Sequence, residues 1–271
     1  MSIFVYYTPQ FRSRVSDPRG HIRNLIAVTN TAFANTQVPL RLSEFCIEEL
    51  NSGESYSTGQ RLQDFWNAKG SSSGLLKGAD IAILMNSRGV SSEIYFYKVS
   101  ILRNLTLQTS DASGAAYLGP SAQTGAPPIG WVQLGHELIF THEVGHLFGC
   151  HHNREVTSSG NGFNYGYLLR GSNMLTVMAY FSGNYRQWIP YFSNDDFNAN
   201  GVPMGTSRDD NRRQLIEARF AVANRGNEAG TCGGDGGGGG TSCSNGRGDA
   251  NCNYWAQLGF CNHSYQAFMQ A

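Results

Sequence analysis

Charged residues are scarce in this chain, and the two signs balance. They make up 15% of 271 residues, against about 25% in an average globular domain. Lysine plus arginine number 20 and aspartate plus glutamate number 20, so the formal net charge is zero. Nucleic-acid-binding domains usually carry a basic excess that neutralises phosphates. The composition therefore predicts a protein with no nucleic-acid partner.

The sequence also lacks the run of about 20 apolar residues that a membrane-spanning helix needs, so no transmembrane segment is expected. Residues 1–7 lack the basic and apolar regions of a secretory signal peptide and instead resemble a first strand. We therefore expect that Met1 opens a trimmed chain, from which an export signal and a propeptide are absent.

Hydrophobic residues, at 40%, and aromatic residues, at 12%, are plentiful enough for a globular core. Glycine is concentrated locally, because 11 of the 33 glycines lie between Gly226 and Gly248. A stretch with few side chains has little to bury and behaves as a flexible linker. We predict a main domain at residues 1–226, a glycine-rich linker at residues 227–242 and a small tail at residues 243–271.

The first part of the main domain alternates strand-like and helix-like patterns. Runs of β-branched and apolar residues predict strands at residues 3–7, 38–42 and 80–85. Apolar residues at helical spacing predict a helix between each pair of strands, one containing Ile22, Leu25, Ile26 and Phe33 and the other Leu62, Phe65 and Trp66. This βαβαβ order predicts an α/β fold with a mostly parallel sheet flanked by helices.

The pattern is looser between residues 89 and 130, where we expect hairpins and loops, including a strand-like segment at residues 94–101. Residues 115–118 lie between two glycines and form a candidate edge strand. Helices are predicted at residues 134–148 and 211–222, the second with Leu215, Ile216, Arg219 and Phe220 on one face.

Residues 142–152 read HEVGHLFGCHH, which matches the pattern H-E-x-x-H-x-x-G-x-x-H. Four residues apart on a helix, His142 and His146 lie on one face and can reach one metal ion. Gly149 permits a positive φ that would return His152 as the third ligand. Glu143 can then act as the general base for a zinc-bound water.

Three alternatives to this interpretation remain open. One is that the histidines cluster by chance on a core helix, and another is that the chain is a catalytically inactive relative of an enzyme. The neighbouring His151 could also replace His152 as a ligand; the spacing favours His152, with His151 facing solvent or supporting the ligands.

The extended histidine motif, followed by Met178 in the segment TVMAY, resembles the metzincin zinc endopeptidases. Their fold implies an α/β (α+β) domain with a mostly parallel twisted sheet, an antiparallel edge strand, an active-site helix and a smaller C-terminal subdomain. The resemblance implies one catalytic zinc ion, with Met178 on a tight turn beneath it and Tyr180 donating to the developing oxyanion. It also implies that a protein or peptide substrate pairs with the edge strand at residues 115–118. The chain most resembles the reprolysin-like branch and its microbial relatives, which the run from Tyr191 to Asn194 after Pro190 supports.

The tail resembles the first part of a ShK toxin-like domain, through Cys243, Cys252, Trp255, Cys261 and Met269. That family has six cysteines, and its disulfides join this half to a half that is missing here, so the tail should not fold as its relatives do. The other cysteines are Cys46, Cys150 and Cys232, whose pairing the sequence does not determine; at Cys150 we expect a buried thiol or a half-cystine. Together these features favour a secreted, extracellular protein with disulfide bonds.

Two functions are consistent with the sequence. The first is a secreted zinc endopeptidase, expected to be a monomer, for which the sequence leaves calcium binding open. The alternative is an extracellular binding or adhesion protein with a weak or inactive protease domain. Its binding element would be the ShK-like tail or the Arg247-Gly248-Asp249 segment, which resembles an integrin ligand.

Overall fold

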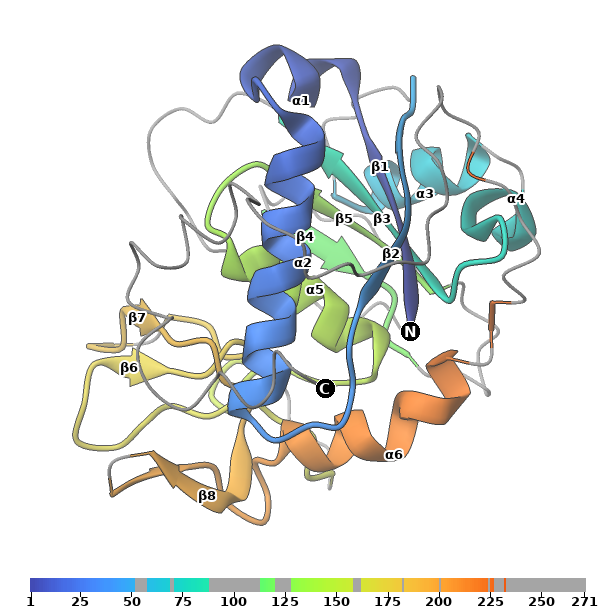
Figure 1. The fold of residues 1–271 in the computed structure, drawn as a ribbon. Helices are drawn as coiled ribbons and strands as arrows, with labels where there is room; N and C mark the ends of the chain where they lie inside the picture. The colour runs from blue at the N-terminus through green and yellow to red at the C-terminus, as the bar shows by residue number, and fades with distance from the viewer. Residues whose placement is uncertain are drawn as a thin grey trace, which may run out of the picture. The chain divides into compact units, whose positions relative to one another are not determined.

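The chain divides into two compact units, Met1–Gly233 and Gly234–Ala271. The computed structural model describes parts of the first unit only: residues 1–51, 58–68, 71–87, 113–119, 128–157, 162–181, 183–199, 201–223, 225–226 and 232 (Figure 1). The ShK-like tail, the Arg-Gly-Asp segment and the strand-like residues 94–101 lie outside the described residues, so those interpretations stay predictions.

A five-stranded sheet in the order β2-β1-β3-β5-β4 forms the centre of the first unit (Figure 1). Its strands are β1 (Ser2–Tyr7), β2 (Ser43–Glu49), β3 (Ile81–Asn86), β4 (Gly114–Ala116) and β5 (Ile129–Gln133). The pairs β1–β2, β1–β3 and β3–β5 are parallel, whereas β4 pairs antiparallel with β5 at the edge. The prediction of a mostly parallel sheet with an antiparallel edge strand is confirmed, but the edge strand occupies Gly114–Ala116 instead of residues 115–118.

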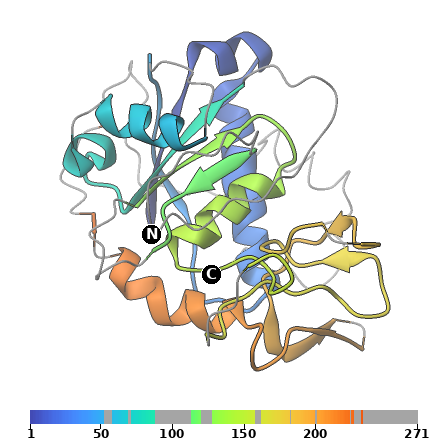
Figure 2. The same cartoon turned by 180° about the vertical axis from the view of Figure 1, so that it is seen from behind.

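Helices cover both faces of this sheet (Figures 1 and 2). They are α1 (Pro9–Arg14), α2 (Pro18–Asn35), α3 (Thr58–Asn67), α4 (Ser72–Leu76) and α5 (Leu138–Leu147). The side chains of β1 point alternately to the two faces of the sheet, which produces two core layers. Ile3 and Val5 belong to the core beneath α2 and α5. Phe4 and Tyr6 belong to the core beneath α3 and α4. At the start of α2, Asp17 caps the helix by accepting a hydrogen bond from the backbone N–H of Gly20.

The smaller C-terminal part of the unit contains short strands and one helix. They are β6 (Met174–Leu175), β7 (Gln187–Trp188), β8 (Asn194–Ala199), β9 (Val202–Met204) and α6 (Asn211–Ala223). Beyond α6, Cys232 forms a disulfide with Cys46 of β2, and Cys150 is a buried free thiol. No helix in the described part of the chain combines the length and the apolar composition that crossing a membrane requires.

The prediction of a strand at residues 38–42 is wrong, because these residues bond to α2 instead of to the sheet. Gln37 has a φ of 58°, which ends the helix, and the N–H of Val38 donates to the carbonyl of Phe33. The side chain of Asn30 then holds both the N–H and the carbonyl of Leu42. The strand begins only at the next residue, as β2.

Three further predictions need correction. Strand β5 was not predicted, because it lies partly in a stretch interpreted as loops. The helix predicted from residue 134 begins at Leu138, after a turn. In α6 the buried face contains Leu215, Ala218 and Val222, and Phe220 is 64% exposed, because the helix presents an i, i+3, i+7 stripe to the core.

Candidate metal centre

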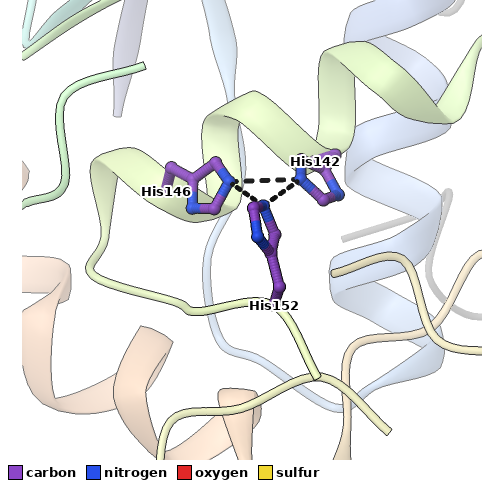
Figure 3. A group of neighbouring side chains, drawn as sticks. All are labelled: His142, His146 and His152. Carbon is purple, nitrogen blue, oxygen red and sulfur yellow. Dashed lines mark hydrogen bonds between the residues drawn. The ribbon is translucent and has the colours of Figure 1, made fainter. Parts of the chain in front are cut away.

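The helix α5 brings three imidazoles together. Nine of its ten residues are buried, including the polar Thr141, His142 and Glu143, so it is a core helix. His142 and His146 lie one turn apart on it, and Gly149, with a φ of +91°, lets the chain leave the helix and return His152 (Figure 3). The three Nε2 atoms are 3.1 Å (His142 to His146), 2.9 Å (His146 to His152) and 3.1 Å (His142 to His152) apart.

Backbone carbonyls determine the orientation of two of these rings. Nδ1 of His142 lies 2.8 Å from the carbonyl oxygen of Val177, and Nδ1 of His146 lies 2.7 Å from that of Cys150. A carbonyl oxygen only accepts, so each Nδ1 carries the proton and each Nε2 presents its lone pair. Two lone pairs facing each other at 3.1 Å repel unless a cation lies between them. The arrangement therefore fits a metal ion held by neutral imidazoles.

Burial favours the neutral form of all three rings. It lowers the pKa of His142 to about 4. The pKa values of His146 and His152 are lowered well below the usual range, first by burial and then by the neighbouring imidazoles. Neutral imidazole is the form that binds a metal. Within the described residues, these histidines are the group of potential ligands close enough to hold one ion.

Glu143 follows His142 in α5, and its carboxylate lies against the edge strand β4. Its pKa is raised well above the usual range by burial. Oε2 is buried and makes no hydrogen bond to the described residues. A buried carboxylate oxygen without a hydrogen bond lowers the stability of the fold unless a donor from outside the protein bonds to it. A water molecule beside the imidazoles would supply that donor, which fits the predicted general-base role.

Met178 lies directly beneath α5, as the resemblance implies. It is fully buried, and its sulfur occupies the space into which a side chain at Gly145 would extend. The preceding carbonyl, of Val177, holds His142, and the following carbonyl, of Ala179, accepts a hydrogen bond from Nε1 of Trp188 at 2.7 Å. The turn therefore packs against α5 at Gly145 and holds the ring of His142 by a hydrogen bond.

Tyr180 stacks on the candidate ligands. Its ring centroid lies 3.9 Å from that of His152 and 5.6 Å from that of His142. Its backbone N–H donates to the side-chain oxygen of Asn153 at 2.8 Å. Asn153 was missed from the sequence, although its position directly after His152 suggests a supporting role. It is fully buried and links the loop of the third histidine to the segment that follows Met178.

His151 points elsewhere than His152. Its ring stacks on Tyr165, with centroids 5.4 Å apart, and its N–H donates to the carbonyl of Asn164. Cys150 contributes its carbonyl to His146, and its buried sulfur lies 3.8 Å from the carbonyl oxygen of Asn211. The structure therefore brings His152, and neither of these neighbours, to the other two imidazoles.

A mostly parallel sheet above a helix that carries converging imidazoles, with a methionine turn below, defines the metzincin class of metallopeptidases. The chain matches the model of the reprolysin-like metallopeptidase family M12B over residues 3–207, and it belongs to this family. The resemblance of residues 3–207 to the metzincins is thereby confirmed.

Relatives with assigned activities are similar over part of their length. A peptidyl-Asp metalloendopeptidase of Stenotrophomonas maltophilia (strain K279a) is 28% identical over 204 residues, which cover 73% of this chain and 46% of the relative. One of Xanthomonas campestris pv. campestris is 32% identical over 142 residues, covering 51% of this chain and 33% of the relative. The chain thus spans less than half the length of these relatives.

A solved structure shares the fold. It is described as the structure of a chaperone-substrate complex, and it superposes with a TM-score of 0.58 at 14% identity, covering 82% of this chain and 34% of the other. At this identity the similarity shows the fold alone.

Proposed function

We propose that this chain is a secreted zinc endopeptidase that hydrolyses internal peptide bonds of protein substrates. The observation that carries the proposal is the convergence of three Nε2 atoms within 3.1 Å of one another, next to a buried carboxylate oxygen with no donor among the described residues. The disulfide between Cys46 and Cys232 supports an oxidising, extracellular setting.

In this proposal His142, His146 and His152 hold the zinc ion. When bound, zinc supplies a Lewis acid that polarises a carbonyl and lowers the pKa of water. Glu143 accepts the proton of the attacking water and transfers it to the leaving amine.

Tyr180 contributes a phenol on the side of His152, where it would donate to the oxygen that becomes negative. Its stacking on His152 and His142 supports that position.

The edge strand β4 is the proposed docking site for the substrate. It is antiparallel to β5, and among the described residues β5 is the strand with which it pairs. A peptide that adds to the other side would gain main-chain hydrogen bonds, which supply affinity with little sequence choice. Side-chain preference must then come from elsewhere around the site.

The names of the relatives suggest a preference for aspartate beside the cut bond, and we propose the same preference for this chain. Matched peptides with Asp, Asn or Glu at one position test it. Faster cleavage of the Asp peptide supports the proposal, and equal kcat/KM values for Asp and Asn refute it.

The activity itself is tested by zinc analysis and by digestion of casein with and without a chelator. We expect about one zinc per chain and cleavage that the chelator abolishes. Glu143→Gln should keep zinc and fold but lower kcat by at least about 100-fold, because proton transfer is lost. A fully active Glu143→Gln chain would contradict the general-base role.

The alternative, an adhesion protein, depends on residues outside the described part of the chain and stays a prediction. Casein digestion by a chain lacking residues 234–271 separates the two functions, because a protease retains its activity without the tail. Monomeric state in solution also remains a prediction, to be measured by light scattering.

A further inference from the structure

Gly114 of β4 lies directly against the carboxylate of Glu143. A Cβ atom added at Gly114 would lie 2.6 Å from Oε1, 2.8 Å from Cγ and 2.9 Å from Cδ of Glu143. Contacts this short are well inside van der Waals distance, so a side chain at Gly114 and the observed position of the carboxylate exclude each other.

Backbone conformation does not explain this glycine. Positive φ values occur at other glycines of the described chain, including Gly149, but not at Gly114. An L-residue can therefore adopt the local conformation of Gly114 without strain. What excludes a side chain is the space that Glu143 occupies.

The edge strand cannot easily move away to make that space. Gly114 pairs with Val132 of β5, and the carbonyl of Ser113 accepts a hydrogen bond from the N–H of Gln133 at 2.8 Å. Beyond the strand, the N–H of Gly119 donates to the carbonyl of His146 at 2.9 Å. The segment is thus attached to β5 on one side and to α5 at its end, so an added methyl group would displace the carboxylate and leave the strand in place.

We infer that Gly114 is a positioning residue for Glu143: its missing side chain admits the carboxylate to the space between β4 and α5. The inference rests on the proposed function, in which Glu143 is the general base. It adds that the strand proposed to receive the substrate also sets the position of the base. A misplacement of about 1 Å can cost about 100-fold in rate.

Gly119 offers a contrast within the same segment. A Cβ there would collide with the backbone carbonyl of Leu147, which cannot rotate away as a side chain can. Gly119→Ala should therefore lower the melting temperature strongly, whereas Gly114→Ala should mainly lower turnover.

The test uses the zinc-loaded chain and a fluorogenic peptide that it cleaves. Gly114→Ala should keep its zinc and leave KM within about threefold, but lower kcat by at least about 10-fold. The matched control is Gly135→Ala, whose added Cβ would meet nothing closer than 3.5 Å, from Cδ1 of Ile139. This control should retain the kcat and melting temperature of the parent chain.

A double-mutant cycle identifies the partner. In a Glu143→Ala background the colliding atoms are gone, so adding Gly114→Ala should change neither the residual rate nor the melting temperature. The inference is overturned if Gly114→Ala keeps kcat within about threefold of the parent, or if its effects persist unchanged in the Glu143→Ala background. A Glu143→Ala chain that remains fully active instead refutes the proposed function, while the melting temperatures still report whether the two residues touch.

Discussion

The disulfide between Cys46 and Cys232 should supply a large share of the stability of the first unit. It joins residues 186 positions apart, and so connects β2 to the chain beyond α6. In the chain-entropy model, closing a loop of this length destabilises the unfolded chain by about 5 kcal/mol at 25 °C. Removal of a native disulfide typically lowers the free energy of unfolding by about 2 to about 5 kcal/mol. The whole free energy of unfolding of a domain is about 5 to about 15 kcal/mol.

The perturbation is Cys232→Ser in a chain of residues 1–233, compared with the same chain intact. Guanidinium unfolding without reductant should show a loss of about 2 to 5 kcal/mol in the free energy of unfolding. Activity on a short peptide should change by less than about twofold, since Cys46 lies on β2, at the opposite edge of the sheet from β4. Under dithiothreitol the two chains should become equally stable.

Two results would refute this reasoning: equal unfolding free energies without reductant, or a difference that persists with dithiothreitol. The experiment also bears on the predicted boundary at Gly226, because Cys232 lies in the stretch assigned to the linker. Deleting residues 234–271 should leave stability and peptide kcat/KM nearly unchanged. Deleting residues 227–271 should reproduce the stability loss of Cys232→Ser.

Three further predictions concern the metal centre. His152→Ala should abolish stoichiometric zinc binding, since two protein ligands hold the ion poorly, whereas His151→Ala should retain it; equal zinc loss in both would contradict the ligand assignment. Gly145→Ala should lower the free energy of unfolding by about 1 to 3 kcal/mol, because its methyl group would overlap the sulfur of Met178. An unchanged melting curve would show that the methionine turn moves aside without loss of stability. Tyr180→Phe should lower kcat by less than the loss of the general base does, and an unaltered kcat would limit this tyrosine to packing.

Local patterns in the sequence were sufficient to predict much of the site and the fold. The spacing of His142 and His146 follows from helix geometry alone, and the positive φ of Gly149 follows from the need to end the helix and turn back. The strand β3 and the buried face of α2 follow from periodicity. Each of these features depends on residues near one another in the chain, which is why a single sequence reveals them.

Features that depend on distant segments were not predictable in the same way. The contact of Gly114 with Glu143 and the hydrogen bond of Asn153 to Tyr180 join segments whose approach only the fold determines. The strand β5 was not predicted because the glycines and prolines that flank it are typical of loops. The exposed Phe220 shows a related error: two overlapping apolar stripes exist on α6, and the surrounding core selects between them.

The helix α2 holds in place two of the segments that surround the three imidazoles. Its Thr29 hydroxyl donates to a carbonyl of α2, so the hydroxyl of Thr141, which lies 2.9 Å away in α5, must donate to Thr29. At its end, the hydroxyl of Thr36 accepts the N–H of Phe192 at 2.9 Å, which fixes the chain that follows the methionine turn. A buried hydrogen bond of this kind adds only modestly to the stability of the fold. Removing one of its partners lowers the stability by much more, because the other partner is then buried without a bond. One helix therefore sets the positions of two separate segments around the three imidazoles, and the geometry that a metal requires is built by the scaffold.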